Sequence, residues 1–146
     1  MTVETVNAIR MSRTIRAGRQ AVWDAWTQPE HMKKWACPAP DGVKSIDADL
    51  RVGGSFRLVM EVPDGRFTAF GTYREVDEPN RLVYTWDWEE EDHRMGVATV
   101  VTVDFIEKDD ATEVVLTHAG FPALEAKQGH EEGWGACLGN FEGLFG

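Results

Sequence analysis

The segment RLVYTWDW, residues 81–88, alternates hydrophobic and polar side chains and is predicted to be a strand. Side chains alternate between the two faces of a strand, so Leu82, Tyr84, Trp86 and Trp88 share one face. Three large aromatic side chains on one face predict either a core beneath the sheet or the wall of a cavity. The two interpretations are compatible, because one face can be core at one end and pocket at the other.

The same alternation recurs along most of the chain. Turn residues such as Gly53-Gly54, Pro63-Asp64-Gly65 and Glu78-Pro79-Asn80 separate the alternating segments. The predicted strands are residues 5–16, 43–50, 55–62, 66–76, 81–88, 97–108 and 112–120. The last six follow one another with short connections, which predicts an antiparallel meander.

Hydrophobic residues recur at steps of three and four in two other segments, which predicts helices there. Residues 19–35 predict two short helices, and the T-x-x-E capping box of residues 27–30, with Pro29 in the first turn, marks the start of the second. Residues 130–145 predict a C-terminal helix with Glu131 and Glu132 at its N-terminus. Its glycines each cost roughly 1 kcal/mol relative to alanine, so this helix must be packed on something.

The order of these elements is strand, two short helices, six strands and a final helix. This order predicts an α+β helix-grip fold, in which a seven-stranded curved antiparallel sheet surrounds a long C-terminal helix. No internal repeat, linker or low-complexity segment divides the chain, so we expect residues 1–146 to form a single domain.

The net charge of the chain limits the classes of partner that it is expected to bind. The net charge of −10 over 146 residues argues against nucleic acid and anionic membranes, which require clustered Lys and Arg. The chain has no apolar run of the roughly 18 residues that a membrane span requires. Residues 1–16 contain no apolar segment typical of a signal peptide, and Cys37 and Cys137 have no disulfide or metal-site spacing. We therefore expect a cytoplasmic protein without metal or cofactor.

Several motifs together resemble a known family. They are RTIRAGRQAVWDAWTQPEHMKKW, DLRVGGSFRLVM, GTYREVDEPNRLVYTW, VVTVDFIEKDDATEVVLTHAGF and HEEGWGACLGNFEGL, in this order. The chain resembles the homologues of the activator of the 90-kDa heat-shock protein ATPase, within the START-like, birch-pollen-allergen-like (SRPBCC) superfamily. The resemblance implies a largely apolar cavity between the sheet and the C-terminal helix. It also implies a small hydrophobic or amphipathic ligand, such as a lipid, a sterol or a polyketide-like molecule.

We predict that aromatic and apolar residues from several elements form the wall or mouth of this cavity. The predicted ligand-binding residues are Trp35, Phe56, Phe70, Tyr84, Trp86, His118, Phe121, Trp134, Leu138 and Phe141. The apolar members would bind by area, while Tyr84, His118 and the indole N–H groups would orient the ligand.

His118 follows Val114 and Leu116 on one face of a predicted strand. It is interpreted either as a structural histidine or as a polar anchor that titrates near neutral pH. If the chain is an enzyme, a cyclase or hydrolase acting on a hydrophobic substrate, His118 is the candidate general base. A third possibility is an interaction module whose acidic surface docks a chaperone or regulator.

Three further features leave alternatives open. Arg57, Glu61 and Asp87 are expected on the solvent face or in a cross-strand pair, with a ligand-binding Arg57 as the alternative. The acidic loop EEEDHR, residues 89–94, is interpreted as a solvated loop at the cavity rim rather than a metal site. Residues 120–129 form either a lid carrying Phe121, Pro122 and Leu124 or an ordinary loop.

Overall fold

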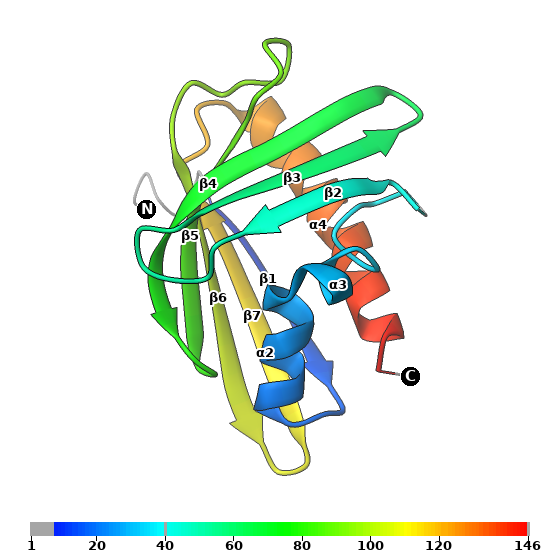
Figure 1. The fold of residues 1–146 in the computed structure, drawn as a ribbon, viewed down its shortest axis with the longest axis vertical. Coiled ribbons are helices and arrows are strands. Elements are labelled where there is room, and N and C mark those ends of the chain that lie inside the picture. The colour runs from blue at the N-terminus through cyan, green and yellow to red at the C-terminus, as the bar shows by residue number, and fades with distance from the viewer. Residues whose placement is uncertain (1–7, 40, 146) are drawn as a thin grey trace.

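Seven antiparallel strands form one curved sheet in the order β1-β7-β6-β5-β4-β3-β2 (Figure 1). The computed structural model describes residues 8–39 and 41–145, so residues 5–7 of the predicted first strand lie outside the described part. The strands are β1 (Ala8–Ile15), β2 (Val43–Ala48), β3 (Ser55–Val62), β4 (Gly65–Asp77), β5 (Arg81–Trp88), β6 (Thr99–Lys108) and β7 (Ala111–Ala119). The predicted meander is confirmed, because β2 to β7 pair in chain order and β1 pairs with β7.

The helices of the described residues are α2 (Arg19–Thr27), α3 (Pro29–Met32) and α4 (Leu124–Gly143). The curved sheet wraps around α4, while α2 and α3 lie beside its lower part (Figure 1). Helix α4 contacts β1, α2 contacts β6 and β7, and α3 contacts β2. The α+β helix-grip class and the two short helices after the first strand are therefore confirmed.

The start of α3 differs in detail from the sequence prediction. Its N-cap is Gln28, which makes no side-chain capping hydrogen bond, and Pro29 occupies the first turn as predicted. The Thr27 hydroxyl instead donates to the carbonyl of Trp23 at 2.8 Å, one turn back in α2. The predicted capping box was wrong, because Thr27 ends α2 as a helical residue and its side chain is used there.

Helix α4 begins at Leu124, six residues before the predicted start. The segment LEAKQ consists of strong helix formers, and their propensity extends the helix across Gly129. Residues 124–129 are therefore helix rather than lid or loop, and Glu125 rather than Glu131 or Glu132 lies in the first turn. Leu124 is exposed, whereas Phe121 just before the helix is buried.

Aromatic side chains dominate the core between α2 and α4. The Trp26 ring lies 4.4 Å from that of Trp35, 5.2 Å from that of Phe141 and 6.2 Å from that of Trp134. Strands β4 and β5 approach each other closely at position 71, and this approach requires glycine there. A Cβ there would lie 1.9 Å from the carbonyl oxygen of Thr85.

Candidate functional site

A pocket with a volume of about 690 Å³ lies between the sheet and the N-terminal half of α4. Strands β3 and β5 form one side, and the segment after α3 contributes to the mouth. Its lining is largely apolar or aromatic: Met32, Trp35, Ala36, Pro38, Ala39, Leu58, Met60, Val62, Pro63, Phe67, Tyr84, Trp86, Trp88, Met95, Ala126, Trp134 and Cys137, with the glycines Gly129 and Gly133. The polar lining residues are Asp64, His93, Glu125, His130 and Glu132.

The shared face of β5 supplies much of the pocket wall. Tyr84, Trp86 and Trp88 line the pocket, while Leu82 lies in the core as its continuation. The Trp86 ring packs edge-on against that of Trp88 at 5.3 Å and lies 5.4 Å from that of Trp134 on α4. Burial raises the pKa of Tyr84, and a smaller opposite effect comes from its hydrogen bond with the Trp26 indole. One strand face thus serves as both core and pocket wall.

His130 is a polar residue of the pocket that the sequence analysis did not single out. Its Nδ1 lies 2.7 Å from the carbonyl oxygen of Ala126, one helical turn back. Its Nε2 accepts hydrogen bonds from the indole N–H groups of Trp86 and Trp88, each at 3.2 Å. These partners assign the neutral tautomer with the proton on Nδ1. Burial lowers the pKa of His130, against smaller opposing effects of the Ala126 carbonyl and Asp87.

The spacing of His130 from Trp134 in the sequence could have predicted that His130 faces the pocket. Residues four apart lie on the same side of a helix, so His130 and Trp134 face the sheet together. The predicted helix began at residue 130 itself, which placed this histidine at an end rather than within a helical face.

His118 lies behind the pocket wall and is fully buried. Its Nδ1 accepts a hydrogen bond from the Trp134 indole at 3.0 Å, and its Nε2 lies 2.7 Å from the Thr99 hydroxyl. That hydroxyl donates to the carbonyl of Trp86 at 2.6 Å, so it receives the proton of Nε2. Burial, with a smaller effect of His130, holds the pKa of His118 well below its usual value. Both ring nitrogens are occupied, which leaves no lone pair for a general base.

The structure distributes the predicted ligand-binding residues over three locations. Trp35, Tyr84, Trp86 and Trp134 line the pocket. A second group is buried outside the lining: Phe56, His118, Phe121, Leu138 and Phe141.

The third location is the outer face of the sheet. Phe70 lies there with 39% of its surface exposed, opposite Arg57 and Asp87 in the neighbouring strands. Its position departs from the predicted wall because its buried neighbour Ala69 takes the inward position on β4.

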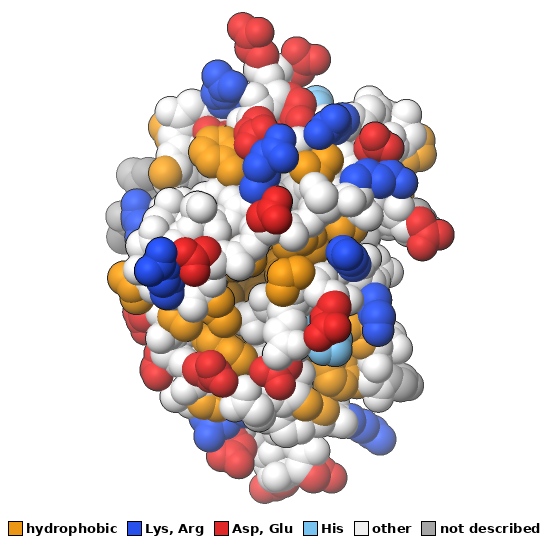
Figure 2. All heavy atoms as spheres, in the orientation of Figure 1, with side chains coloured by type: hydrophobic (Ala, Val, Ile, Leu, Met, Phe, Trp, Pro, Cys, Tyr) orange, Lys and Arg blue, Asp and Glu red, His pale blue; other side chains and the backbone are white. Residues whose placement is uncertain are grey.

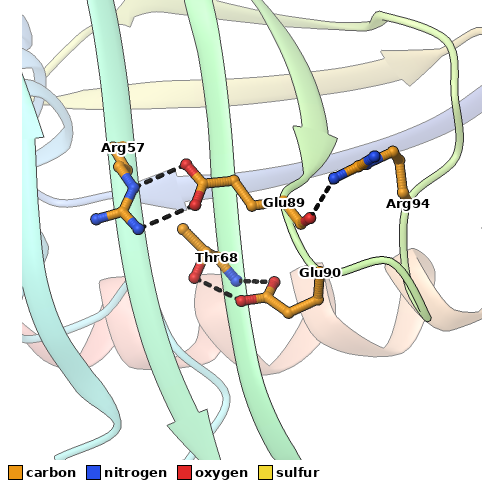
Figure 3. A network of polar contacts seen from close by, with 5 residues as sticks. All are labelled: Arg57, Thr68, Glu89, Glu90 and Arg94. Atoms are coloured by element: carbon orange, nitrogen blue, oxygen red, sulfur yellow. Dashed lines mark hydrogen bonds and ion pairs between the residues drawn. The ribbon is translucent and has the colours of Figure 1, made fainter.

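The acidic loop between β5 and β6 is held by side chains rather than freely solvated. Glu90 accepts from the backbone N–H and the hydroxyl of Thr68, at 2.6 and 2.7 Å (Figure 3). Glu89 accepts two hydrogen bonds from Arg57, at 2.7 and 2.9 Å, and its carbonyl accepts from Arg94 (Figure 3). Arg57 therefore lies on the outer face, as predicted, and its ion pair is with Glu89 just beyond the end of β5; Glu61 is also exposed.

Asp87 lies on the outer face opposite Phe70, as predicted, but it is buried there rather than exposed to solvent, with only 8% of its surface exposed. Its carboxylate accepts from the backbone N–H groups of Met95 and Gly96, at 2.8 and 3.2 Å. The His93 ring stacks on Phe67 at 3.9 Å. The loop is thereby fixed at the pocket, and its residues His93 and Met95 belong to the lining.

Both cysteines are free and buried, and Cys137 lines the pocket. Burial, with a smaller contribution from Cys37, raises the pKa of the Cys137 thiol to about 12. At neutral pH the thiol is protonated and a poor nucleophile. In the described part of the chain, no three His, Cys, Asp or Glu side chains are grouped to hold a metal ion. None of the described helices is long and apolar enough to cross a membrane.

The model of a protein family described as "Activator of Hsp90 ATPase homolog 1-like protein" matches residues 16–146. A crystal structure of a protein from Nitrosomonas europaea is 27% identical, with a TM-score of 0.78 over 94% of this chain and 93% of that chain. A protein from Chromobacterium violaceum is 21% identical, with a TM-score of 0.82 over 96% and 97% of the two chains, and this likeness shows the fold. Among curated proteins none matches.

Proposed function

The chain belongs to the activator of Hsp90 ATPase homolog 1-like family, and from this premise we propose that it binds a small hydrophobic or amphipathic molecule in the pocket between the sheet and α4. The observation that carries the proposal is the pocket itself. Its volume of about 690 Å³ lies within the range of about 300–1,000 Å³ typical of small-molecule sites. Lipids, sterols and polyketide-like molecules fit its largely apolar lining.

The glycines of α4 support this proposal. A Cβ at Gly133 would meet no atom within 4 Å, so this glycine is not required for close packing of the helix. Gly129 likewise has open space, and both glycines border the pocket. Each glycine costs roughly 1 kcal/mol of helix stability relative to alanine. Space for a ligand is a function that offsets this cost.

Among the predicted ligand-binding residues, Trp35, Tyr84, Trp86 and Trp134 would contact the ligand directly. His118, Phe56, Phe121, Leu138 and Phe141 would act through them, by supporting the wall from behind. His130 joins the proposed site as the residue that holds the indoles of Trp86 and Trp88 in place.

A matched pair of glycine substitutions tests the proposal. Gly133→Leu places a side chain at the pocket, whereas Gly139→Leu places it on an exposed part of α4 with equally open space and outside the lining. The probe is the neutral fluorophore N-phenyl-1-naphthylamine, titrated into each protein at pH 7.5. We expect saturable binding to the wild type and to Gly139→Leu, and its loss in Gly133→Leu with unchanged circular dichroism. Equal binding by both variants, or none by the wild type, would contradict a ligand site in this pocket.

Two other functions stay predictions with less support. A reaction with His118 as general base would require its ring to leave the hydrogen bonds to Trp134 and Thr99. Docking of a chaperone or regulator is supported by the family name and the acidic character of the chain. We also propose a cytoplasmic location, which the two free cysteines support because reducing compartments keep thiols free.

A further inference from the structure

We propose that the pocket selects amphiphiles that carry a cationic group, such as an alkylammonium, over anionic amphiphiles such as fatty acids. This inference rests on the proposed ligand-binding function and adds the charge of the ligand. Its basis is the lining, which includes the carboxylates of Asp64, Glu125 and Glu132 and, among the described residues, neither Lys nor Arg.

The three carboxylates belong to lining residues that are exposed to solvent. Asp64 belongs to the turn between β3 and β4, and Glu125 and Glu132 are seven residues apart on one side of α4. Because all three residues are exposed to solvent, their charge is available to a ligand whose polar end remains at the mouth while its apolar end is buried.

The indole N–H donors of the wall already have acceptors within the protein, so they are not available to bind an anion. The indole N–H groups of Trp86 and Trp88 donate to His130, and that of Trp134 donates to His118. The indole N–H of Trp35 donates to the carbonyl of Ala25 at 2.8 Å. What remains toward the pocket is ring surface, and the faces of aromatic rings attract cations.

Two arginines near the pocket are held on the outer face of the sheet by hydrogen bonds to the acidic loop. Arg57 and Arg94 bind Glu89 on the side of the strands opposite α4 (Figure 3). His130 is held neutral by its hydrogen bonds and by burial, which lowers its pKa. On the face shown in Figure 2, acidic side chains lie at the tip of the β5–β6 loop, at the top of the view, with Lys or Arg side chains below them. An approaching anion thus meets negative charge without a compensating cation in the lining.

The test uses three probes with the same tail: octylammonium, octanol and octanoate. Each is titrated into the protein at pH 7.5 and low salt, below its micellar concentration, and followed by calorimetry. We expect octylammonium to bind about tenfold more tightly than octanoate, and this ratio to shrink at high salt because the mouth is open to water. Replacing both pocket carboxylates of α4, in Glu125→Gln/Glu132→Gln, lowers the ratio severalfold. Glu131→Gln, a charge change on α4 outside the lining, serves as control and leaves the ratio nearly unchanged.

The outcomes separate the two proposals. If octanol binds in the pocket but octanoate binds as tightly as octylammonium, the charge preference is wrong and the ligand site stands. The preference is also wrong if Glu131→Gln lowers the ratio as much as the double variant does, because net charge alone would then be the cause. If none of the three probes binds, and N-phenyl-1-naphthylamine does not bind either, the proposed function itself fails.

Discussion

Acidification from pH 7.5 to 5.5 is expected to destabilise the protein through the buried His118. The side chain is fully buried as a neutral imidazole, with Trp134 on one nitrogen and Thr99 on the other. Its pKa in the folded protein lies well below the ordinary value of 6.5. The unfolded chain takes up a proton near pH 6.5, and the folded protein does not. The stabilisation is therefore complete above about pH 6.5 and is lost as the pH falls below it.

The magnitude follows from linkage. A histidine that stays neutral in the folded protein and titrates at about 6.5 in the unfolded chain lowers the free energy of unfolding by about 1.4 kcal/mol between pH 7.5 and 5.5. His130, whose pKa is also lowered, adds to the same fall. The pKa values of Glu89 and Glu90 are lowered below 4.5, so their contributions are lost only in more acidic solution. The chosen pH interval therefore isolates the histidines from these carboxylates.

Urea unfolding at the two pH values, followed by far-ultraviolet circular dichroism, measures this fall. In His118→Gln the protein loses stability at both pH values, because the bond from Trp134 is disturbed. The difference between the two pH values should nevertheless shrink by about 1.4 kcal/mol. The His130→Gln variant retains His118, so its free energy of unfolding should still fall by at least the amount assigned to His118 between the two pH values. A wild type equally stable at pH 7.5 and 5.5, or a His118→Gln variant with an undiminished fall, would refute a neutral buried His118.

Three further substitutions test the packing of α4 and the acidic loop. Phe141→Ala removes a fully buried ring that packs edge-on against both Trp26 and Trp35 and should lower the free energy of unfolding by about 3–5 kcal/mol in urea titrations. Gly139→Ala should raise it by about 1 kcal/mol, because a Cβ there meets no neighbour and alanine favours the helix; a loss of stability would show that this glycine has a packing role. Asp87→Ala removes the acceptor of the N–H groups of Met95 and Gly96, so hydrogen exchange at these amides should become faster, and unchanged exchange would show that the loop is held by other contacts.

Much of the fold was predictable because alternation and turn residues act locally. The face shared by Leu82, Tyr84, Trp86 and Trp88 follows from the geometry of a strand, and the structure places all four toward the interior. The start of α4 was misplaced because Gly129 resembles a helix break in sequence, whereas the helix formers of residues 124–128 carry the helix across it. The later glycines of α4 stay helical because the helix packs on other parts of the protein, and this packing cannot be read from local propensity.

The site was less predictable than the fold because it depends on which residues meet across elements. The alternation of side chains along β4 shows which residues share a face, but not which face of the sheet is concave. This is why Phe70 was expected in the wall of the pocket. The pairing of His130 with two indoles from β5 joins residues more than forty positions apart in the chain. Such pairings depend on the register of α4 against the sheet, which no local pattern specifies.

The hydrogen bonds through His118 bear on how that register is fixed. They run from Trp134 on α4 to His118 on β7, then to Thr99 on β6 and finally to the carbonyl of Trp86 on β5. Hydrophobic contacts tolerate small rotations and shifts of a helix, whereas a chain of directional bonds holds in only one arrangement. These hydrogen bonds thus fix the glycine-rich helix α4 against three strands at one point. A rotation of α4 about its axis would break this series of hydrogen bonds before it could change the shape of the pocket.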